Sequence, residues 1–455
     1  ARVVDEQLFE DDEAVVVRFN GGANAGHTLV VGNKKIVLHQ VPSGIFYPEM
    51  LLYIGSGCVI TPKKLNDEIA DIRSAEISLD GRLFISSHAP LIQPHHLLYD
   101  EWFGGGIGTT KNGIGPCYAD QALRAQGDAI RNIKFGEYLV DPGKGFSAVK
   151  RNLEEFLDLW PLAKADVIGK MEHFDAEVMK LQEYRSEDPL FLERLIQSGK
   201  NVFFEGAQSV LLDAVTGMTP YVTSSRTLAG AAYTGGDLSL KYHHKTIGIA
   251  KAIMSRVGRG PFISEFGGKQ SDEYCAEGEG KAHAKEMEQK EWNLEELKHS
   301  DDAFLQGVYL RMKGNEYGAT TGRPRRIGTL DLVQLKQSCA LNGVNELYLN
   351  KFDALTEFGE MNLPGIPVVV AYRLDGRVID YVPTTLAEME RVQPITECLP
   401  NIPDVSNVRA EKELPPAAKE MVEFIEEFVG VKVCGIGVGP ERDAFVDTSM
   451  KERLK

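Results

Sequence analysis

The stretch AVVVRFNGGANAGHT, residues 14–28, decides how the rest of the chain is interpreted. Its first part, Ala14–Phe19, is rich in valine and predicts a buried strand that ends directly in a glycine-rich turn. Similar strand-like runs occur further along, at Leu51–Ile54, Asn201–Phe204, Asn345–Leu349, Pro367–Tyr372 and Lys432–Gly435. Segments with helical spacing of apolar residues lie between many of them, as at Phe146–Trp160 and Pro415–Val429. The alternation predicts an α/β fold with a mostly parallel central sheet and helices on both faces.

The composition is that of an acidic globular chain. Its 455 residues carry a net charge of −16, which argues against a nucleic-acid partner or an anionic membrane, since both need a basic surface. The apolar runs are too short to span a bilayer, and the first residues do not resemble a signal peptide. No two of the six cysteines have C-x-x-C spacing, which favours reduced thiols over a zinc site or a disulfide framework. We expect a cytoplasmic protein.

A four-residue motif after a strand-like segment indicates guanine recognition. Asn350-Lys351-Phe352-Asp353 matches the N-K-x-D pattern, in which the Asp carboxylate accepts hydrogen bonds from guanine N1–H and the exocyclic amine. Adenine would leave this carboxylate unpaired, at a cost of about 1–3 kcal/mol, so the motif discriminates between the purines. The glycine-rich Gly435–Pro440 follows another strand and would let backbone approach a flat ligand. Each motif alone is also consistent with an ordinary loop.

Three more turns carry residues suited to a nucleotide. Gly21–Thr28 combines glycines with Asn24 and His27, which predicts an anion site with an imidazole donor at its edge. Ile107–Pro116 offers two threonine hydroxyls and a run of backbone N–H groups for a phosphate. Phe204–Gln208 and the downstream Pro220–Ser225 offer amide and hydroxyl groups that can read a purine edge.

Two charged segments can also be explained as ordinary solvated surface. Gly318–Arg326 places threonines and arginines in a glycine-bounded loop that could clamp a dicarboxylate, although an exposed arginine cluster is commonly a solvated patch. The segment from about Gly268 to Lys313 is rich in Glu and Lys, and we interpret it as a charged, solvated insertion with a helix over Ala282–His299. Adjacent histidines such as His95-His96 and His243-His244 diverge on a strand or helix, which indicates structural roles.

In this order, the motifs resemble those of the adenylosuccinate synthetases, over nearly the whole chain from Val3 to about Val446. The most specific segments are Gly21–Val30, Gly108–Tyr118, Phe204–Gln208, Pro220–Ser225 and Glu316–Arg326. The resemblance implies a single large α/β domain, residues 1–455, with a P-loop-NTPase-like fold around one long sheet. It also implies a GTP-dependent ligase of AMP biosynthesis. Such enzymes phosphorylate O6 of IMP, and the amine of L-aspartate then displaces the phosphate to give adenylosuccinate.

The resemblance also implies roles for individual residues. His27 would be the catalytic imidazole, and the Gly26 carbonyl would ligate Mg²⁺. The residues implied to hold IMP are Asn24, Thr109, Thr110, Arg124, Gln208 and Thr223, with Arg124 reaching the neighbouring subunit of a homodimer. The residues implied to line the aspartate pocket are Val257, Thr320, Thr321, Arg323 and Arg325. The residues implied to surround the guanine of GTP are Lys351, Asp353, Gly437 and Gly439.

The family begins with a strand and a Gly-Asp-Glu-Gly-Lys loop, whose Asp acts as a base and metal ligand, and we expect these ahead of Ala1. Two alternatives depend on that loop. A viral branch with a small residue in place of the Asp aminates a guanine nucleotide instead of IMP. A catalytically silent, nucleotide-binding homologue would lack the loop. The guanine motif at Asn350–Asp353 favours GTP as the phosphoryl donor and the ordinary enzyme.

Overall fold

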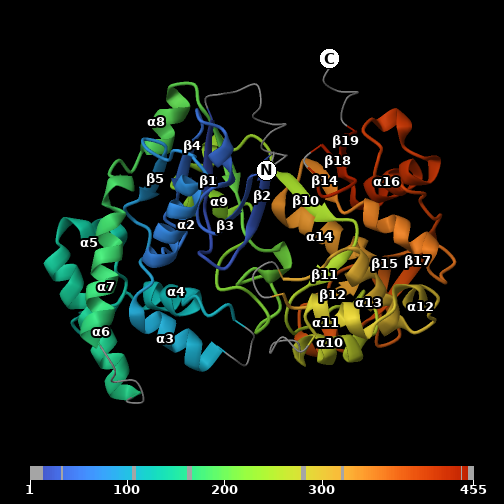
Figure 1. The fold of residues 1–455 in the computed structure, drawn as a ribbon, viewed down its shortest axis with the longest axis horizontal. Coiled ribbons are helices and arrows are strands. Elements are labelled where there is room, and N and C mark those ends of the chain that lie inside the picture. Colours follow the sequence, from blue (N-terminus) through green and yellow to red (C-terminus); the bar gives the residue numbers. More distant parts are fainter. Residues whose placement is uncertain are drawn as a thin grey trace. The chain divides into compact units, whose positions relative to one another are not determined.

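The computed structural model describes residues 14–31, 34–104, 109–160, 167–277, 283–318, 322–441 and 443–448. The chain divides into two units, Ala1–His243 (unit 1) and His244–Lys455 (unit 2), each with its own sheets and core (Figure 1). The α/β class expected from the sequence is confirmed. One domain over residues 1–455 stays a prediction.

A five-stranded, fully parallel sheet forms the centre of unit 1. Its order is β8 (Arg185–Ser186), β5 (Leu83–Ser86), β4 (Leu51–Ile54), β1 (Ala14–Arg18), β9 (Asn201–Glu205). Every residue of β1 is buried, because this strand pairs on both sides and is covered on both faces. That double burial explains why its first four residues, Ala14–Val17, are all apolar instead of alternating with polar ones. The strand predicted at Ala14–Phe19 is therefore confirmed.

Helices surround this sheet, and two small hairpins accompany it. The hairpins are β2 (His27–Val31) with β3 (Lys34–Leu38), and β6 (Ala125–Gln126) with β7 (Ala129–Ile130). The helices are α2 (Pro62–Ser74), α3 (Pro94–Phe103), α4 (Ile114–Leu123), α5 (Phe135–Val140), α6 (Pro142–Leu159), α7 (Val167–Lys180), α8 (Phe191–Gln197) and α9 (Ala231–Gly235). The predicted helix over Phe146–Trp160 is α6. It begins earlier than expected, because Asp141 caps the Lys144 N–H and Pro142 suits the first helical position.

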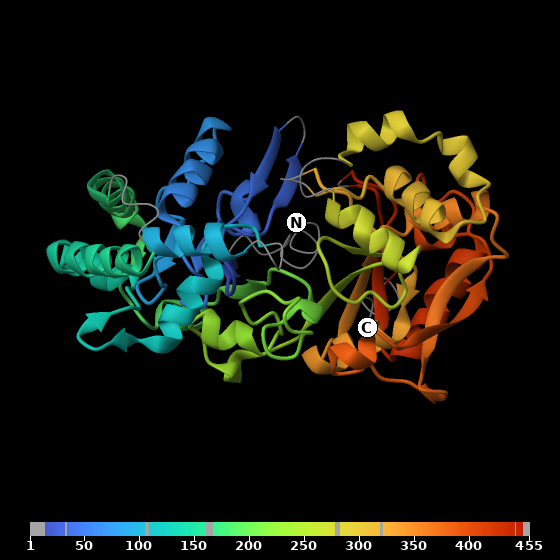
Figure 2. The same ribbon diagram turned by 90° about the horizontal axis from the view of Figure 1, so that it is seen from below.

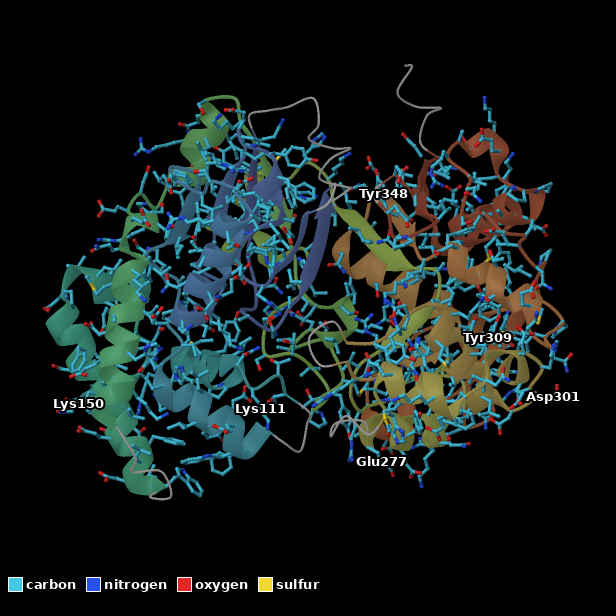
Figure 3. The ribbon with its side chains drawn as sticks, viewed as in Figure 1. Lys111, Lys150, Glu277, Asp301, Tyr309 and Tyr348 are labelled. Atoms are coloured by element: carbon cyan, nitrogen blue, oxygen red, sulfur yellow. The ribbon has the colours of Figure 1, made fainter. Side chains whose placement is uncertain are left out.

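Unit 2 contains two larger sheets and a short two-stranded sheet. In the first sheet β10 (Ile247–Lys251), β14 (Glu346–Asn350) and β18 (Lys432–Gly437) are parallel, and β19 (Phe445–Asp447) is antiparallel. The second sheet comprises β13 (Leu330–Asp331), β15 (Ile366–Leu374), β16 (Arg377–Ile379) and β17 (Gln393–Leu399). The two-stranded sheet pairs β11 (Met254–Arg256) with β12 (Arg326–Gly328) in antiparallel orientation. Tyr348, labelled in Figure 3, is a buried residue of β14.

The helices of unit 2 are α10 (Gly268–Glu277), α11 (Lys285–Glu291), α12 (Leu294–Lys298), α13 (Ala303–Lys313), α14 (Leu332–Asn342), α15 (Leu386–Met389) and α16 (Pro416–Val429). α16 confirms the helix predicted over Pro415–Val429. It buries Met421 and Ile425 in the core and ends at Gly430, whose φ of 78° suits a helix terminus. Among the residues whose placement is described, no helix combines the length and the apolar character that a membrane span requires.

The segment 268–313 differs from its prediction. Its helices, yellow in Figure 2, gather on one side of unit 2, and the helix expected over Ala282–His299 is interrupted between α11 and α12. The solvated interpretation is wrong for α13, where most residues are buried, whereas most residues of α11 and α12 are exposed except Glu288 and Leu297. The many charged residues predicted an exposed segment, but the Glu288 carboxylate is buried because it pairs with the equally buried Arg311.

Candidate functional site

Unit 1 holds the predicted catalytic imidazole against a buried carboxylate. His27 Nδ1 lies 2.7 Å from Glu205 Oε1, and Arg18 Nη1 lies 3.2 Å from the same oxygen. Arg18 and Glu205 are register partners on β1 and β9, so the sheet itself brings them together. Burial raises the pKa of Glu205, but the His27 hydrogen bond, the Arg18 charge and the Ser43 N–H outweigh it and hold the pKa below its usual range. An ionised Glu205 favours a proton on His27 Nδ1 and leaves Nε2 available.

The sequence analysis quoted Glu205 within a motif and gave it no role. A signal was present, because an acidic residue at the end of an apolar strand lies where parallel sheets gather functional groups. Its partner could not be read from the sequence, because His27 is 178 residues away along the chain.

Polar side chains converge on the turn after β1. A side chain at Gly21 would lie 3.1 Å from Gln208 Oε1 and 3.3 Å from Asn24 Oδ1, so only glycine fits among these groups. Gln208 adopts a φ of 65°, which is costly for a residue that is not glycine. Within the described part of the chain, Gln208 Oε1 and Ser225 Oγ are buried without a hydrogen-bond partner. Buried polar atoms of this kind suit a ligand that supplies the missing hydrogen bonds.

The turn that carries Thr109 and Thr110 lies next to the turn that follows β1. Asn112 Nδ2 donates to Thr110 Oγ1 at 3.0 Å and to the Ala23 carbonyl at 2.9 Å, which ties this turn to the residue before Asn24. Thr109 Oγ1 accepts from the Lys111 N–H at 3.2 Å. Lys111 is labelled in Figure 3. Gly108 lies outside the described residues.

Arg124 lies at the C-terminal end of α4, whereas the turn that carries Thr109 and Thr110 precedes the N-terminal end of this helix. It is exposed and adopts a φ of 64°, while its backbone carbonyl accepts from the Arg131 N–H at 2.9 Å. The structure thus holds the backbone of Arg124 in a strained conformation with its side chain at the surface.

The segment that carries Thr223 is organised by Asp213, a residue the sequence analysis did not single out. Asp213 is fully buried, and its carboxylate accepts from the backbone N–H groups of Thr216 at 3.0 Å and Thr227 at 2.7 Å. Burial raises the pKa of Asp213, but these N–H groups outweigh it and lower the pKa to about 2. Thr223 is fixed in turn by its N–H, which donates to the Leu212 carbonyl at 2.8 Å. The loop therefore presents Thr223 and Ser225 from a charged, hydrogen-bonded anchor.

His95 and His96 converge instead of diverging. Both Nε2 atoms lie 3.0 Å from Asp120 Oδ2, so the divergence expected for adjacent histidines is wrong at this helix start. Among the described residues these three form the one grouping with metal-ligand spacing. The Gln93 N–H donates to His96 Nδ1 at 3.0 Å, which leaves the ring proton of His96 on Nε2, facing the carboxylate. Burial lowers the pKa of His96 to about 4, so this ring is neutral and its predicted structural role fits.

In unit 2, the guanine motif and the glycine turn lie together. The Phe352 N–H donates to the Gly437 carbonyl at 2.9 Å, and a side chain at Gly437 would lie 3.0 Å from Asn350 Oδ1. Gly439 follows in the same turn after β18. Burial raises the pKa of Asp353, against the opposing charge of Lys351. The carboxylate is thus partly withdrawn from water, where hydrogen bonds to a purine edge are worth most.

Two residues of the predicted aspartate pocket lie next to the antiparallel pair of β11 and β12. Arg256 pairs with Arg326, which places Val257 and Arg325 at the same end of this strand pair. The Gly318 N–H donates to the Arg323 carbonyl at 2.8 Å and closes the base of the loop, while Thr320 and Thr321 lie outside the described residues. Arg326 is 3% exposed and forks onto Glu265 at 2.8 and 2.5 Å, so it is a structural arginine.

A buried carboxylate, Glu316, links residues of unit 2 that are predicted to bind aspartate with residues predicted to bind guanine. Its oxygens lie 2.5 Å from Arg325 Nη1, 3.0 Å from Lys251 Nζ and 3.3 Å from Lys351 Nζ. Burial raises the pKa of Glu316, but the charges of Lys251, Lys351 and Arg325 outweigh it and lower the pKa to about 2. One carboxylate among three cations leaves an excess of positive charge. Glu316 begins the quoted segment Glu316–Arg326 but had no predicted role, and Lys251 was not singled out, because their partners come from different strands and loops.

Comparison with known proteins identifies relatives of the whole chain. A family model described as adenylosuccinate synthetase matches residues 1–446. The chain is 41% identical over 442 residues to adenylosuccinate synthetase 2 of Cupriavidus pinatubonensis (strain JMP 134 / LMG 1197), covering 97% of this chain and 93% of the relative. The fully ligated adenylosuccinate synthetase of Plasmodium falciparum superposes with a TM-score of 0.81 at 29% identity, covering 98% of this chain and 96% of that one.

A second solved structure shows the fold alone. The succinoaminodeoxyadenylate synthetase of cyanophage S-2L, bound to dGMP and dATP, superposes with a TM-score of 0.56. It is 16% identical to this chain, and the match covers 98% of this chain and 90% of that one.

Proposed function

The chain belongs to the adenylosuccinate synthetase family of ligases, and we propose that it joins L-aspartate to IMP with GTP as the phosphoryl donor. The observation that carries this proposal is the His27–Glu205 pair, in which an ionised carboxylate orients an imidazole at the mouth of a glycine-lined turn. Such a pair stabilises the charge that develops during phosphoryl transfer. The cytoplasm is the proposed compartment.

In the first step, O6 of IMP attacks the γ-phosphorus of GTP, GDP leaves, and the N1 proton of the purine passes to a base. This step converts a poor leaving group into a good one. His27 would stabilise or protonate a phosphate oxygen through Nε2 while Glu205 holds Nδ1. Asn24, Gln208 and Thr223 would bind the purine nucleotide, and Thr109 and Thr110 would hold its phosphate. The carbonyl of the exposed Gly26 would hold Mg²⁺, since carbonyl oxygen is a ligand type that this ion accepts, and the ion would supply positive charge to the phosphates.

In the second step, the aspartate amine attacks C6 of the phosphorylated purine, and inorganic phosphate leaves. Arg323 and Arg325, with the backbone near Val257, would grip the two carboxylates of aspartate and orient its amine. The excess positive charge around Glu316 supports an anionic ligand at this loop. Thr320 and Thr321 remain part of the proposed pocket on sequence grounds.

The guanine of GTP would be bound by Asp353 and Lys351 against the Gly437–Gly439 turn. The proposed homodimer would use Arg124 across its interface, and the exposed, strained position of Arg124 supports a role outside its own subunit.

The test is a reconstitution with purified full-length protein, IMP, L-aspartate, GTP and Mg²⁺. We expect adenylosuccinate and GDP to form in equal amounts, and ATP to be a poor donor. Formation of the aminated product from dGMP but not from IMP would identify the viral-type reaction instead. Nucleotide binding without turnover on either substrate would indicate the silent homologue.

A further inference from the structure

Arg325 is held at both its side chain and its backbone. Its guanidinium Nη1 donates to Glu316 Oε2 at 2.5 Å, and its backbone N–H donates to the Glu316 carbonyl at 3.0 Å. Its own carbonyl accepts from Arg311 Nη1 at 3.1 Å. The last contact comes from α13, within the segment 268–313 that the sequence analysis interpreted as a solvated insertion.

Arg311 is fixed as a donor by a buried ion pair. The Arg311 side chain is 1% exposed, and its Nη2 and Nε lie 2.6 Å and 3.1 Å from Oε1 of the fully buried Glu288. The Tyr317 hydroxyl donates to the other carboxylate oxygen at 2.5 Å. The fork leaves Nη1 directed at the Arg325 carbonyl, with a further contact to Cys275 Sγ at 3.7 Å. Residues of α10, α11 and α13 therefore converge on one guanidinium.

Stability alone does not account for this arrangement. Replacing a buried ion pair by apolar side chains of similar volume is often neutral or stabilising by about 1–4 kcal/mol. What an apolar pair cannot supply is a directed donor for a backbone carbonyl at a chosen position.

We propose that the segment 268–313 is a positioning element for the carboxylate-binding loop, and that it acts through Arg311, which Glu288 holds in place. The inference rests on the proposed function, because it assumes that Arg323 and Arg325 bind aspartate. Arg311 itself touches no substrate in this scheme. It fixes the backbone from which both arginines project, and a displacement of about 1 Å in such a group can cost ~10²-fold in rate.

The decisive variant is the double substitution Glu288→Gln with Arg311→Met, which removes both buried charges and the donor to Arg325 while preserving approximate volume. We expect the KM for aspartate to rise ~10- to 100-fold, because the clamp is no longer preorganised. At saturating aspartate, kcat should stay within about threefold, and the KM for GTP should not change. The backbone amides of Gly322, Arg323, Arg325 and Arg326 should exchange hydrogen faster than in the wild type, a readout independent of activity.

The matched control is Lys298→Gln, which removes the 2.6 Å ion pair between α12 and Glu360 in the same segment. This variant should keep wild-type constants and exchange. Arg311→Lys retains the charge beside Glu288 but loses the second donor arm, so its effect on the aspartate KM should approach that of the double variant. Tyr317→Phe removes one donor to Glu288 and should give a smaller rise.

A folded double variant with a wild-type aspartate KM overturns the inference. If that variant does not fold, an unchanged aspartate KM in both Arg311→Lys and Tyr317→Phe overturns it equally. The proposed function is tested separately by Arg325→Lys. If this variant also leaves the aspartate KM unchanged, the proposed aspartate site fails; if it raises the KM while the Arg311 variants do not, only the positioning role fails.

Discussion

Two buried glutamates organise the two units in opposite ways. Glu205 in unit 1 is matched by one arginine and an imidazole, so its surroundings are close to electrically balanced. Glu316 in unit 2 faces Lys251, Arg325 and Lys351, so its surroundings carry excess positive charge. Unit 1 instead leaves neutral polar atoms, Gln208 Oε1 and Ser225 Oγ, without partners among the described residues. The two surroundings therefore differ: unit 1 offers neutral polar atoms without partners, and unit 2 offers three cations beside one carboxylate.

The largest expected effect comes from replacing His27, the imidazole beside Glu205 in unit 1. His27→Asn removes the group that Glu205 orients, and we expect kcat to fall ~10³- to 10⁴-fold with near-normal binding of IMP and GTP. Steady-state kinetics and equilibrium nucleotide binding measure the two quantities. The exposed His244 offers the control His244→Asn, which should retain wild-type turnover. Retained turnover in His27→Asn would remove this residue from the mechanism.

The next effect tests whether charge at residue 205 matters or only its shape. Glu205→Gln keeps the volume but cannot fix the His27 tautomer as a carboxylate does, so kcat should fall ~10²- to 10³-fold. The KM for IMP should change little. Glu193→Gln, which removes a carboxylate paired with Lys241 on the surface of unit 1, is the control. Equal activity of Glu205→Gln and wild type would show that the balance around residue 205 is structural only.

The third-largest expected effect concerns the choice of nucleotide by unit 2. Asp353→Asn replaces an acceptor pair with a mixed donor and acceptor, so the preference between GTP and xanthosine triphosphate should shift by ~10²-fold toward the latter. Competition between the two donors in the same assay measures the shift. Asp375→Asn, at an exposed turn of the same unit, should leave the preference unchanged. An unaltered preference in Asp353→Asn would contradict the guanine assignment.

The smallest expected effect is a rise in the KM values for both aspartate and GTP. Glu316→Gln leaves three cations without their common carboxylate, and we expect the KM values for aspartate and GTP each to rise about tenfold. The matched control is Glu346→Gln on β14, which removes a carboxylate that is paired with Lys245. A change confined to one ligand would show that Glu316 serves only one of the two sites.

The same residue predicts a pH dependence of stability. The pKa of Glu316 is lowered to about 2 in the folded protein, so its contribution is fully present above the unfolded value near ~4.3 and is lost as pH falls toward 2. The difference in unfolding free energy between wild type and Glu316→Gln should therefore be constant from pH 7 to about 5 and shrink below about 4. Denaturant titrations over this range measure it. A difference that grows on acidification would contradict the assignment.

The sequence by itself determined the strands, the main helices and the turns in which the site residues lie. Valine-rich runs such as Ala14–Phe19 and motifs such as Asn350–Asp353 are local patterns, and local patterns report whether a segment is a buried strand or a ligand-binding turn. The α/β class and the positions of His27, Gln208 and Asp353 shortly after strands followed from such patterns.

Only the tertiary structure decided which charges meet. Glu205 meets an imidazole 178 residues away, and Glu316 meets Lys251 from a strand 65 residues away. The same reason explains the error over segment 268–313, because a glutamate on a charged helix has the same local pattern whether it is solvated or paired with a buried arginine. Pairing of this kind is set by how strands and helices pack, and packing brings together residues that no local spacing connects.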